Sequence, residues 1–155
     1  MRTIKSGWLV VALAMLEAPA LAGSPGGFPA GTWILDAAAS KPLAATSQVL
    51  EIIADDGRSL TFSLHPTDAD PAAKGLTWKG TYGSAPHPIE GSSILFGVAH
   101  GPHGSILISG RLGDGRPFHE KCHIAPSRRR LRCEGTVSGT DGSNTNYLEV
   151  YDLRR

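Results

Sequence analysis

The sequence lacks an excess of charge and long apolar runs, and each shortage excludes a class of protein. Fifteen Lys and Arg residues nearly balance fourteen Asp and Glu residues, so the chain lacks the positive charge on which nucleic-acid binding depends. Its longest apolar run, Trp8 to Leu16, is too short to span a bilayer. We therefore expect a protein that neither binds nucleic acid nor spans a membrane.

The motifs of the common enzyme classes are also missing. There is no nucleophile elbow, phosphate-binding loop or HExxH pair of metal ligands. The six histidines form no catalytic constellation; His119 and His123 would share one strand face with Lys121, which would repel a cation. We expect no enzyme activity, no catalytic residue, no metal site and no cofactor, and we interpret the histidines as solvated.

The first residues have the order of a secretory signal peptide. Arg2 and Lys5 precede the apolar run, and the helix-breaking Pro19 precedes a small-residue cleavage site at 20–22. We expect residues 1–22 to be removed on export and the mature protein to be periplasmic or secreted. The alternative is a cytosolic protein with an apolar N-terminal helix.

The rest of the chain, 133 of 155 residues, fits one domain. Residues 23–30 hold two prolines and three glycines and predict a flexible lead-in to a single domain at 31–155. In that domain, apolar runs of about seven residues alternate with clusters of Gly, Pro, Asp or Asn, and none keeps a helical period. The pattern predicts an all-β fold.

Alternation of apolar and polar residues marks about nine strands joined by short turns. They are expected at 33–35, 48–53, 60–65, 76–82, 93–99, 106–112, 118–124, 131–138 and 147–153. A barrel or a two-sheet sandwich would hide the edges of such a sheet. Connections long enough for a sandwich occur only at 36–47 and 66–74, and glycines within strands suit a coiled barrel. We expect an antiparallel up-and-down β-barrel of about eight to nine strands.

Cys122 and Cys133 lie at equal distances from the turn-prone segment 126–129. An antiparallel hairpin folded there places the two cysteines face to face and Lys121 opposite Glu134. Facing residues in such a ladder lie within bridging range of a disulfide. We therefore predict a Cys122–Cys133 disulfide, which agrees with an oxidising compartment.

The first expected strand opens with Gly31-Thr32-Trp33, which resembles the G-x-W signature of lipocalins and the wider calycin group. The longer string from Gly31 to Asp36, continued through Ser40-Lys41, is similar to small secreted bacterial proteins with lipocalin-like folds, an uncharacterised subfamily. The resemblance extends over most of the mature chain in layout. It implies a lipocalin-like barrel in which Trp33 closes one end beneath the cavity.

A barrel of about eight strands either fills with side chains or holds one small ligand. In a barrel that holds a ligand, the binding candidates are the inward aromatic residues and one carboxylate: Trp33, Phe62, Trp78, Phe96, Phe118 and Glu120. The hairpin register turns Glu120 inward beside the space at Gly135, where it would orient a polar group of the ligand. The alternatives are that the aromatic residues are simply core, and that Glu120 lies at the wet rim or is turned outward by a bulge.

A basic hairpin tip is formed by Arg128, Arg129, Arg130 and Arg132. It is either a charged turn that keeps the loop in water or a contact site for an anionic surface such as lipid head groups. As a whole, the sequence predicts a non-enzymatic periplasmic or secreted barrel that binds a small hydrophobic or amphipathic molecule. The alternative is a periplasmic protein-interaction or protease-inhibitor-like barrel with a filled interior.

Overall fold

The computed structural model describes residues 27–43, 48–66 and 75–154. They form ten strands and one short 3-10 turn, η1 (Pro102–Gly104). The expected signal peptide at 1–22 lies outside the described residues, as does the first half of the lead-in. No helix in the described part is both long and apolar enough to cross a membrane.

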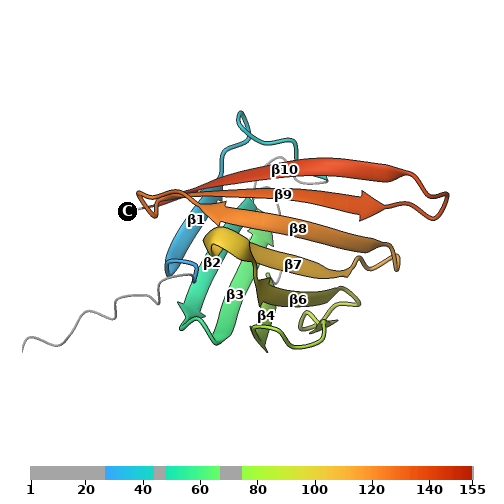
Figure 1. Ribbon diagram of the computed structural model, residues 1–155, viewed down its shortest axis with the longest axis horizontal. Coiled ribbons are helices and arrows are strands. Elements are labelled where there is room, and N and C mark those ends of the chain that lie inside the picture. The colour runs from blue at the N-terminus through green and yellow to red at the C-terminus, as the bar shows by residue number, and fades with distance from the viewer. Residues whose placement is uncertain (1–26, 44–47, 67–74, 155) are drawn as a thin grey trace, which may run out of the picture.

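The strands follow one another as an antiparallel meander. They are β1 (Gly31–Leu35), β2 (Gln48–Asp55), β3 (Ser59–Pro66), β4 (Leu76–Thr81), β5 (His87–Pro88), β6 (Leu95–His100), β7 (Ile106–Arg111), β8 (Pro117–Ile124), β9 (Arg130–Ser138) and β10 (Asn144–Leu153). Their order in the sheet is β4-β3-β2-β1-β10-β9-β8-β7-β6-β5, so the first and last strands are neighbours. In Figure 1, β1 to β4 run steeply behind β6 to β10, whose ribbons lie side by side and roughly horizontal.

The two ends of this sheet meet, which confirms the barrel predicted from the sequence. The Glu90 N–H donates to the Thr77 carbonyl at 2.9 Å, and the Gly83 N–H donates to the Val98 carbonyl at 2.7 Å. Sequence periodicity missed β5, because its two residues are too few to show alternation. The barrel is therefore nearly closed and has ten strands rather than eight or nine.

The hairpin of β8 and β9 has the predicted register. Cys122 faces Cys133, Lys121 faces Glu134, and Glu120 faces Gly135. The two buried cysteines form the predicted disulfide, with their Cα atoms 4.0 Å apart. This pairing fixes which residues of both strands turn inward.

Inward side chains of alternating residues fill most of the barrel, as the period of two requires. Trp33, fully buried, donates its indole N–H to the Pro29 carbonyl at 3.0 Å. Phe28 is also buried, and its backbone N–H donates to Asp55 at 2.7 Å, although residues 23–30 were expected to be a flexible lead-in. Order therefore begins before the first strand, because burial of a phenylalanine side chain contributes about 1.5–3 kcal/mol.

Candidate functional site

A cavity of about 110 Å³ lies inside the barrel, between β2 and β3 on one side and β6 to β10 on the other. Its walls are mostly apolar and come from strands on both sides of the barrel. The apolar lining residues are Phe28, Leu50, Ile52, Leu60, Phe62, Leu64, Phe96, Ile108 and Leu131, together with the disulfide. The polar lining side chains are Glu120, Glu149 and Tyr151. An apolar cavity with a few convergent polar groups is the usual form of a small-molecule site.

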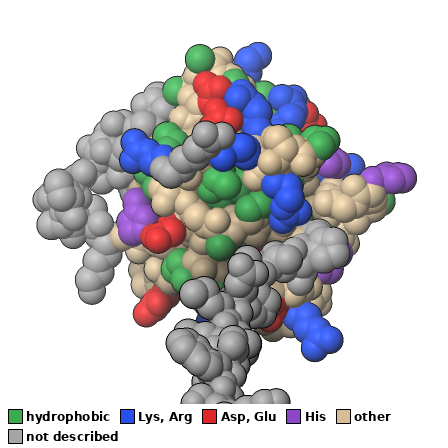
Figure 2. Space-filling view, turned by 90° about the vertical axis from the view of Figure 1, so that its left-hand side faces the viewer, with side chains coloured by type: hydrophobic (Ala, Val, Ile, Leu, Met, Phe, Trp, Pro, Cys, Tyr) green, Lys and Arg blue, Asp and Glu red, His purple; other side chains and the backbone are tan. Residues whose placement is uncertain are grey.

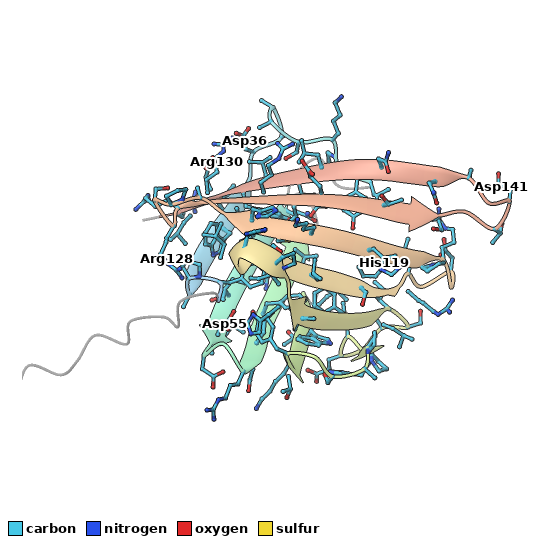
Figure 3. All side chains as sticks on the ribbon, in the orientation of Figure 1. Asp36, Asp55, His119, Arg128, Arg130 and Asp141 are labelled. Atoms are coloured by element: carbon cyan, nitrogen blue, oxygen red, sulfur yellow. A yellow bond between two sulfur atoms is a disulfide. The ribbon has the colours of Figure 1, made fainter. Side chains whose placement is uncertain are left out.

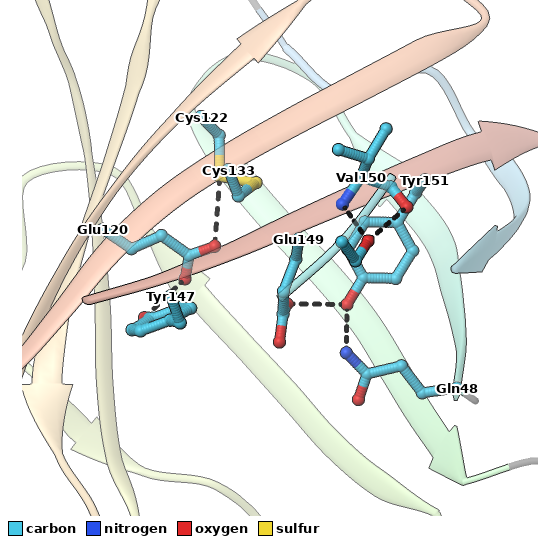
Figure 4. The surroundings of a disulfide bond; sticks show 9 residues. Gln48, Glu120, Cys122, Cys133, Tyr147, Glu149, Val150 and Tyr151 are labelled. Carbon is cyan, nitrogen blue, oxygen red and sulfur yellow. Dashed lines mark hydrogen bonds between the residues drawn. A yellow bond between two sulfur atoms is a disulfide. The ribbon is translucent and has the colours of Figure 1, made fainter. Parts of the chain in front are cut away.

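Glu120 turns into the barrel from β8, as the hairpin register predicted, and borders the cavity. The space expected beside Gly135 is taken by the ring of Tyr147, because a Cβ atom on Gly135 would lie 2.0 Å from the ring. Tyr147 thereby reaches across β9 and donates its hydroxyl to Glu120 Oε2 at 3.4 Å (Figure 4). The missing side chain of Gly135 thus determines how the carboxyl group is held.

A second carboxyl group enters the cavity from β10. The Tyr151 hydroxyl donates to Glu149 Oε2 at 2.8 Å and accepts a hydrogen bond from the side-chain amide of Gln48 (Figure 4). Gln48 and Tyr151 are both buried. The two acids of the cavity are thus each held by a tyrosine hydroxyl of the last strand.

Partial burial raises the pKa of both carboxyl groups. Loss of water around Glu120, followed by the nearby Glu149 charge, raises its pKa to about 8, and the Tyr147 hydroxyl opposes this rise. Burial also raises the pKa of Glu149, against the hydrogen bonds from Tyr151 and Gln48. The pKa values of Tyr147 and Tyr151 are raised as well, first by burial and then by the acidic neighbours. Near neutral pH, Glu120 is therefore mostly a neutral acid that donates as well as accepts.

The disulfide forms part of the cavity wall beside Glu120. Cys122 Sγ lies 3.6 Å from Glu120 Oε1. Because a disulfide sulfur carries no proton, this approach is a contact rather than a hydrogen bond. Glu120, Cys122 and Cys133 are also the group of described residues whose ligand atoms lie close enough to share an ion, but the bonded sulfurs provide no thiolate for it.

The structure divides the predicted site residues into two groups. Phe62, Phe96 and Glu120 line the cavity. Trp33, Trp78 and Phe118 are buried in the core but do not line it. The Trp78 ring packs between His87, with the ring centroids 4.8 Å apart, and Phe96, at 4.9 Å. Trp33, Trp78 and Phe118 thus belong to the packed core around the cavity.

Sequence reasoning missed Glu149, Tyr151, Gln48 and Phe28 as members of the site. A usable signal existed for two of them: Glu149 and Tyr151 alternate with outward residues in step with the buried Tyr147, which places them on the inward face of β10. Gln48 is the first residue of β2, and Phe28 precedes β1. At such positions periodicity does not predict whether a side chain points inward or outward.

The basic hairpin tip is occupied by contacts within the chain. Arg128 and Arg129 donate to the Gly27 and Leu153 carbonyls, both at 3.0 Å. Arg130 pairs with Asp36 at 2.9 Å and with Asp152 at 3.0 Å, and Arg132 pairs with Glu134 at 2.6 Å. Figure 3 labels Asp36 and Arg130 side by side, and Figure 2 shows basic and acidic side chains intermingled on the face it presents. The four guanidinium groups therefore already have acceptors.

Hollows on the outer face of the sheet are larger but differ in chemistry. One of about 410 Å³ lies over β9 and β10 and is lined by Lys41, Arg132, Glu134 and Asn146 among others. Arg132 and Glu134 form a solvent-exposed ion pair with each other. Such exposed pairs contribute about 0–1 kcal/mol, and they are well hydrated. The interior cavity, with its two half-buried acids, is the better candidate site.

The nearly closed antiparallel meander and its interior cavity define the fold as a lipocalin-like β-barrel. Three solved structures of the fluorescent protein UnaG resemble it: an asparagine-to-alanine mutant (TM-score 0.54, 14% identity, 81% of this chain and 96% of that chain), the wild type (0.52, 15%, 81% and 96%) and an asparagine-to-glutamine mutant (0.52, 14%, 80% and 94%). At such low identity the likeness establishes the fold alone. Comparison with models of protein families gives no match, and neither does comparison with curated protein sequences.

Proposed function

We propose that the protein is a non-enzymatic binding protein that holds a small amphipathic molecule inside its barrel. The observation that carries this proposal is the apolar interior cavity with two carboxyl groups at its wall. A folded protein keeps partly desolvated carboxyl groups at a cost in stability, since desolvation opposes their ionised form. A ligand whose polar group meets these acids would compensate part of that cost.

The size of the cavity limits what enters it. An apolar cavity of about 150 Å³ takes a benzene ring, so the 110 Å³ present here suits a group of about five carbon atoms. A larger molecule would place only one end inside. This supports a short-chain amphipath, or the tip of a longer one, as the ligand.

A protein-interaction barrel is the rival function, and the described surface favours it less. Only three large apolar side chains of the described residues are well exposed: Leu43, Ile53 and Leu107. Ile53 and Leu107 lie on β2 and β7, which are not neighbours in the sheet. A protein-binding patch normally brings such side chains together.

We further propose that the barrel works outside the cytoplasm, in the periplasm or after secretion. Two observations support this: the signal-peptide pattern at 1–22 and the buried disulfide of β8 and β9. An enzymatic role has little support. The Ser63 hydroxyl, 2.6 Å from His65 Nε2, is the nearest approach to a nucleophile and base among the described residues, yet Ser63 is buried.

Saturation-transfer NMR with pentan-1-ol tests the binding function. We expect magnetisation to pass from the protein to the alcohol, and the signal to vanish in Ile108→Phe, which fills the cavity. Leu107→Phe is the matched control, because Leu107 is the next residue of β7 and points outward. Equal signals from Ile108→Phe and the wild type would refute binding inside the barrel.

A further inference from the structure

The two acids of the cavity have no basic counterpart among its described walls. The lining from β2, β3, β6 and β7 is apolar, with Leu50 and Ile108 as examples, and β9 contributes Leu131 and one half of the disulfide. No Lys, Arg or His belongs to the described lining. The charge of an ionised acid in this cavity is therefore balanced by nothing in these walls.

The groups that do face the acids are poor substitutes for a cation. Tyr147 and Tyr151 supply one neutral hydroxyl each, at 3.4 Å from Glu120 and 2.8 Å from Glu149, and the neutral Gln48 amide also hydrogen-bonds to Glu149. Glu120 Oε1 meets the disulfide sulfur, which cannot donate to it. One oxygen of Glu120 is thus left facing a cavity without a donor from the described hydrogen-bonded residues.

From this geometry, and resting on the proposed function, we infer that the ligand is an organic cation: a primary or secondary amine on a short apolar body. The ammonium group would sit between Glu120 and Glu149, and the apolar body would lie against Leu50, Leu131 and Phe62. Charge-assisted hydrogen bonds to carboxylates are roughly twice as strong as neutral ones. A carboxylate ligand of the same size would be repelled by the ionised form of either acid.

Binding of such a cation is coupled to proton release. Near pH 7 Glu120 is mostly protonated, since its pKa is raised to about 8. An ammonium group beside it favours the ionised form, so the carboxyl proton leaves to solvent as the ligand enters. The affinity for an amine therefore rises with pH from 5.5 to 8, while the affinity for a neutral alcohol does not.

Three probes of one chain length test the inference: n-pentylamine, pentan-1-ol and pentanoate, titrated into the purified protein by calorimetry. We expect pentylamine to bind about tenfold or more tightly than pentanol, a difference of about 1.4 kcal/mol. Pentanoate should bind least. Titration of pentylamine at pH 7 in two buffers of different ionisation enthalpy should report release of protons to the buffer.

Two variants separate this inference from the binding function itself. Glu120→Gln should lower the affinity for pentylamine about tenfold and leave that for pentanol within about twofold. Glu51→Gln is the matched control, because Glu51 is exposed on β2, and it should change neither affinity. Equal binding of amine and alcohol, or tighter binding of pentanoate, would overturn the cation assignment but keep the barrel as a binding site. If none of the three probes binds, both proposals fail.

Discussion

Tyr147 crosses the backbone of Gly135 and places its hydroxyl on the carboxyl group of Glu120. The three residues belong to three adjacent strands, β10, β9 and β8. A side chain at the middle position would block the outer two from meeting. The glycine of β9 is thus a structural requirement of the candidate site.

Replacement of Gly135 by alanine should destabilise the barrel and free Glu120 from its tyrosine. The new Cβ would lie 2.0 Å from the Tyr147 ring, so the ring must move. We expect a loss of about 1–3 kcal/mol in the free energy of unfolding, measured in urea. Gly113→Ala serves as control, since its Cβ would meet only the Ser93 hydroxyl, at 3.1 Å. Equal stability of the two variants would contradict this account.

Glu120 should make the folded state less stable as the pH rises. Its folded pKa of about 8 lies above the ordinary value of 4.5, so the folded state binds more protons than the unfolded state between these values. The contribution is fully present below pH 4.5 and is lost as the pH rises towards 8. Urea unfolding at pH 5, 6.5 and 8 should show a decline on the order of 1–3 kcal/mol that is weaker in Glu120→Gln. Parallel pH profiles of the two proteins would exclude this role.

Reduction of the disulfide should weaken the protein without changing any residue. Cys122 and Cys133 are 11 residues apart in sequence, and closure of so short a loop restricts the unfolded chain. On the chain-entropy account the bond contributes about 3 kcal/mol. Urea unfolding of the oxidised and the reduced protein measures this difference directly. Mass spectrometry of protein from its native compartment should find no free thiol, and two free thiols there would remove the support for an oxidising location.

Phe28→Ala should enlarge the cavity and admit longer ligands. Phe28 is buried, lines the cavity and is held through its backbone by Asp55. Truncation of a buried phenylalanine typically lowers stability by about 3–5 kcal/mol. We expect the preferred chain length of primary amines to shift upward by several carbon atoms in calorimetric titrations. An unchanged preference would place Phe28 outside the site.

Much of the fold could be predicted from the sequence, because apolar and polar residues alternate along a strand. The mirror arrangement of Cys122 and Cys133 was enough to predict their bond, and the same register gave the inward direction of Glu120. The surroundings of Glu120 were harder to predict. Tyr147 lies over Gly135 because of the register in which β9 pairs with β10. No symmetric pair of residues, comparable with the two cysteines, indicates that register in the sequence.

Which of the inward residues line the cavity could not be predicted from the sequence, for a physical reason. Whether an inward residue lines a void or fills the core depends on packing across the barrel, between residues far apart in the chain. Trp78 packs against Phe96, at 4.9 Å between ring centroids, and so lies outside a cavity that Phe96 itself borders. Likewise, the acceptors of the basic hairpin tip include Asp36, which is 94 residues from Arg130.

The neighbouring positions of β1 and β10 also govern the order in which the chain can acquire its shape during synthesis. Trp33 pairs in register with Leu153, so this pairing joins the first and the last of the described strands. A ribosome delivers Trp33 long before Leu153, and until then the first strand has no partner on that side. The barrel consequently closes only after translation of the final strand, so β1 lacks its β10 partner for most of the chain's synthesis.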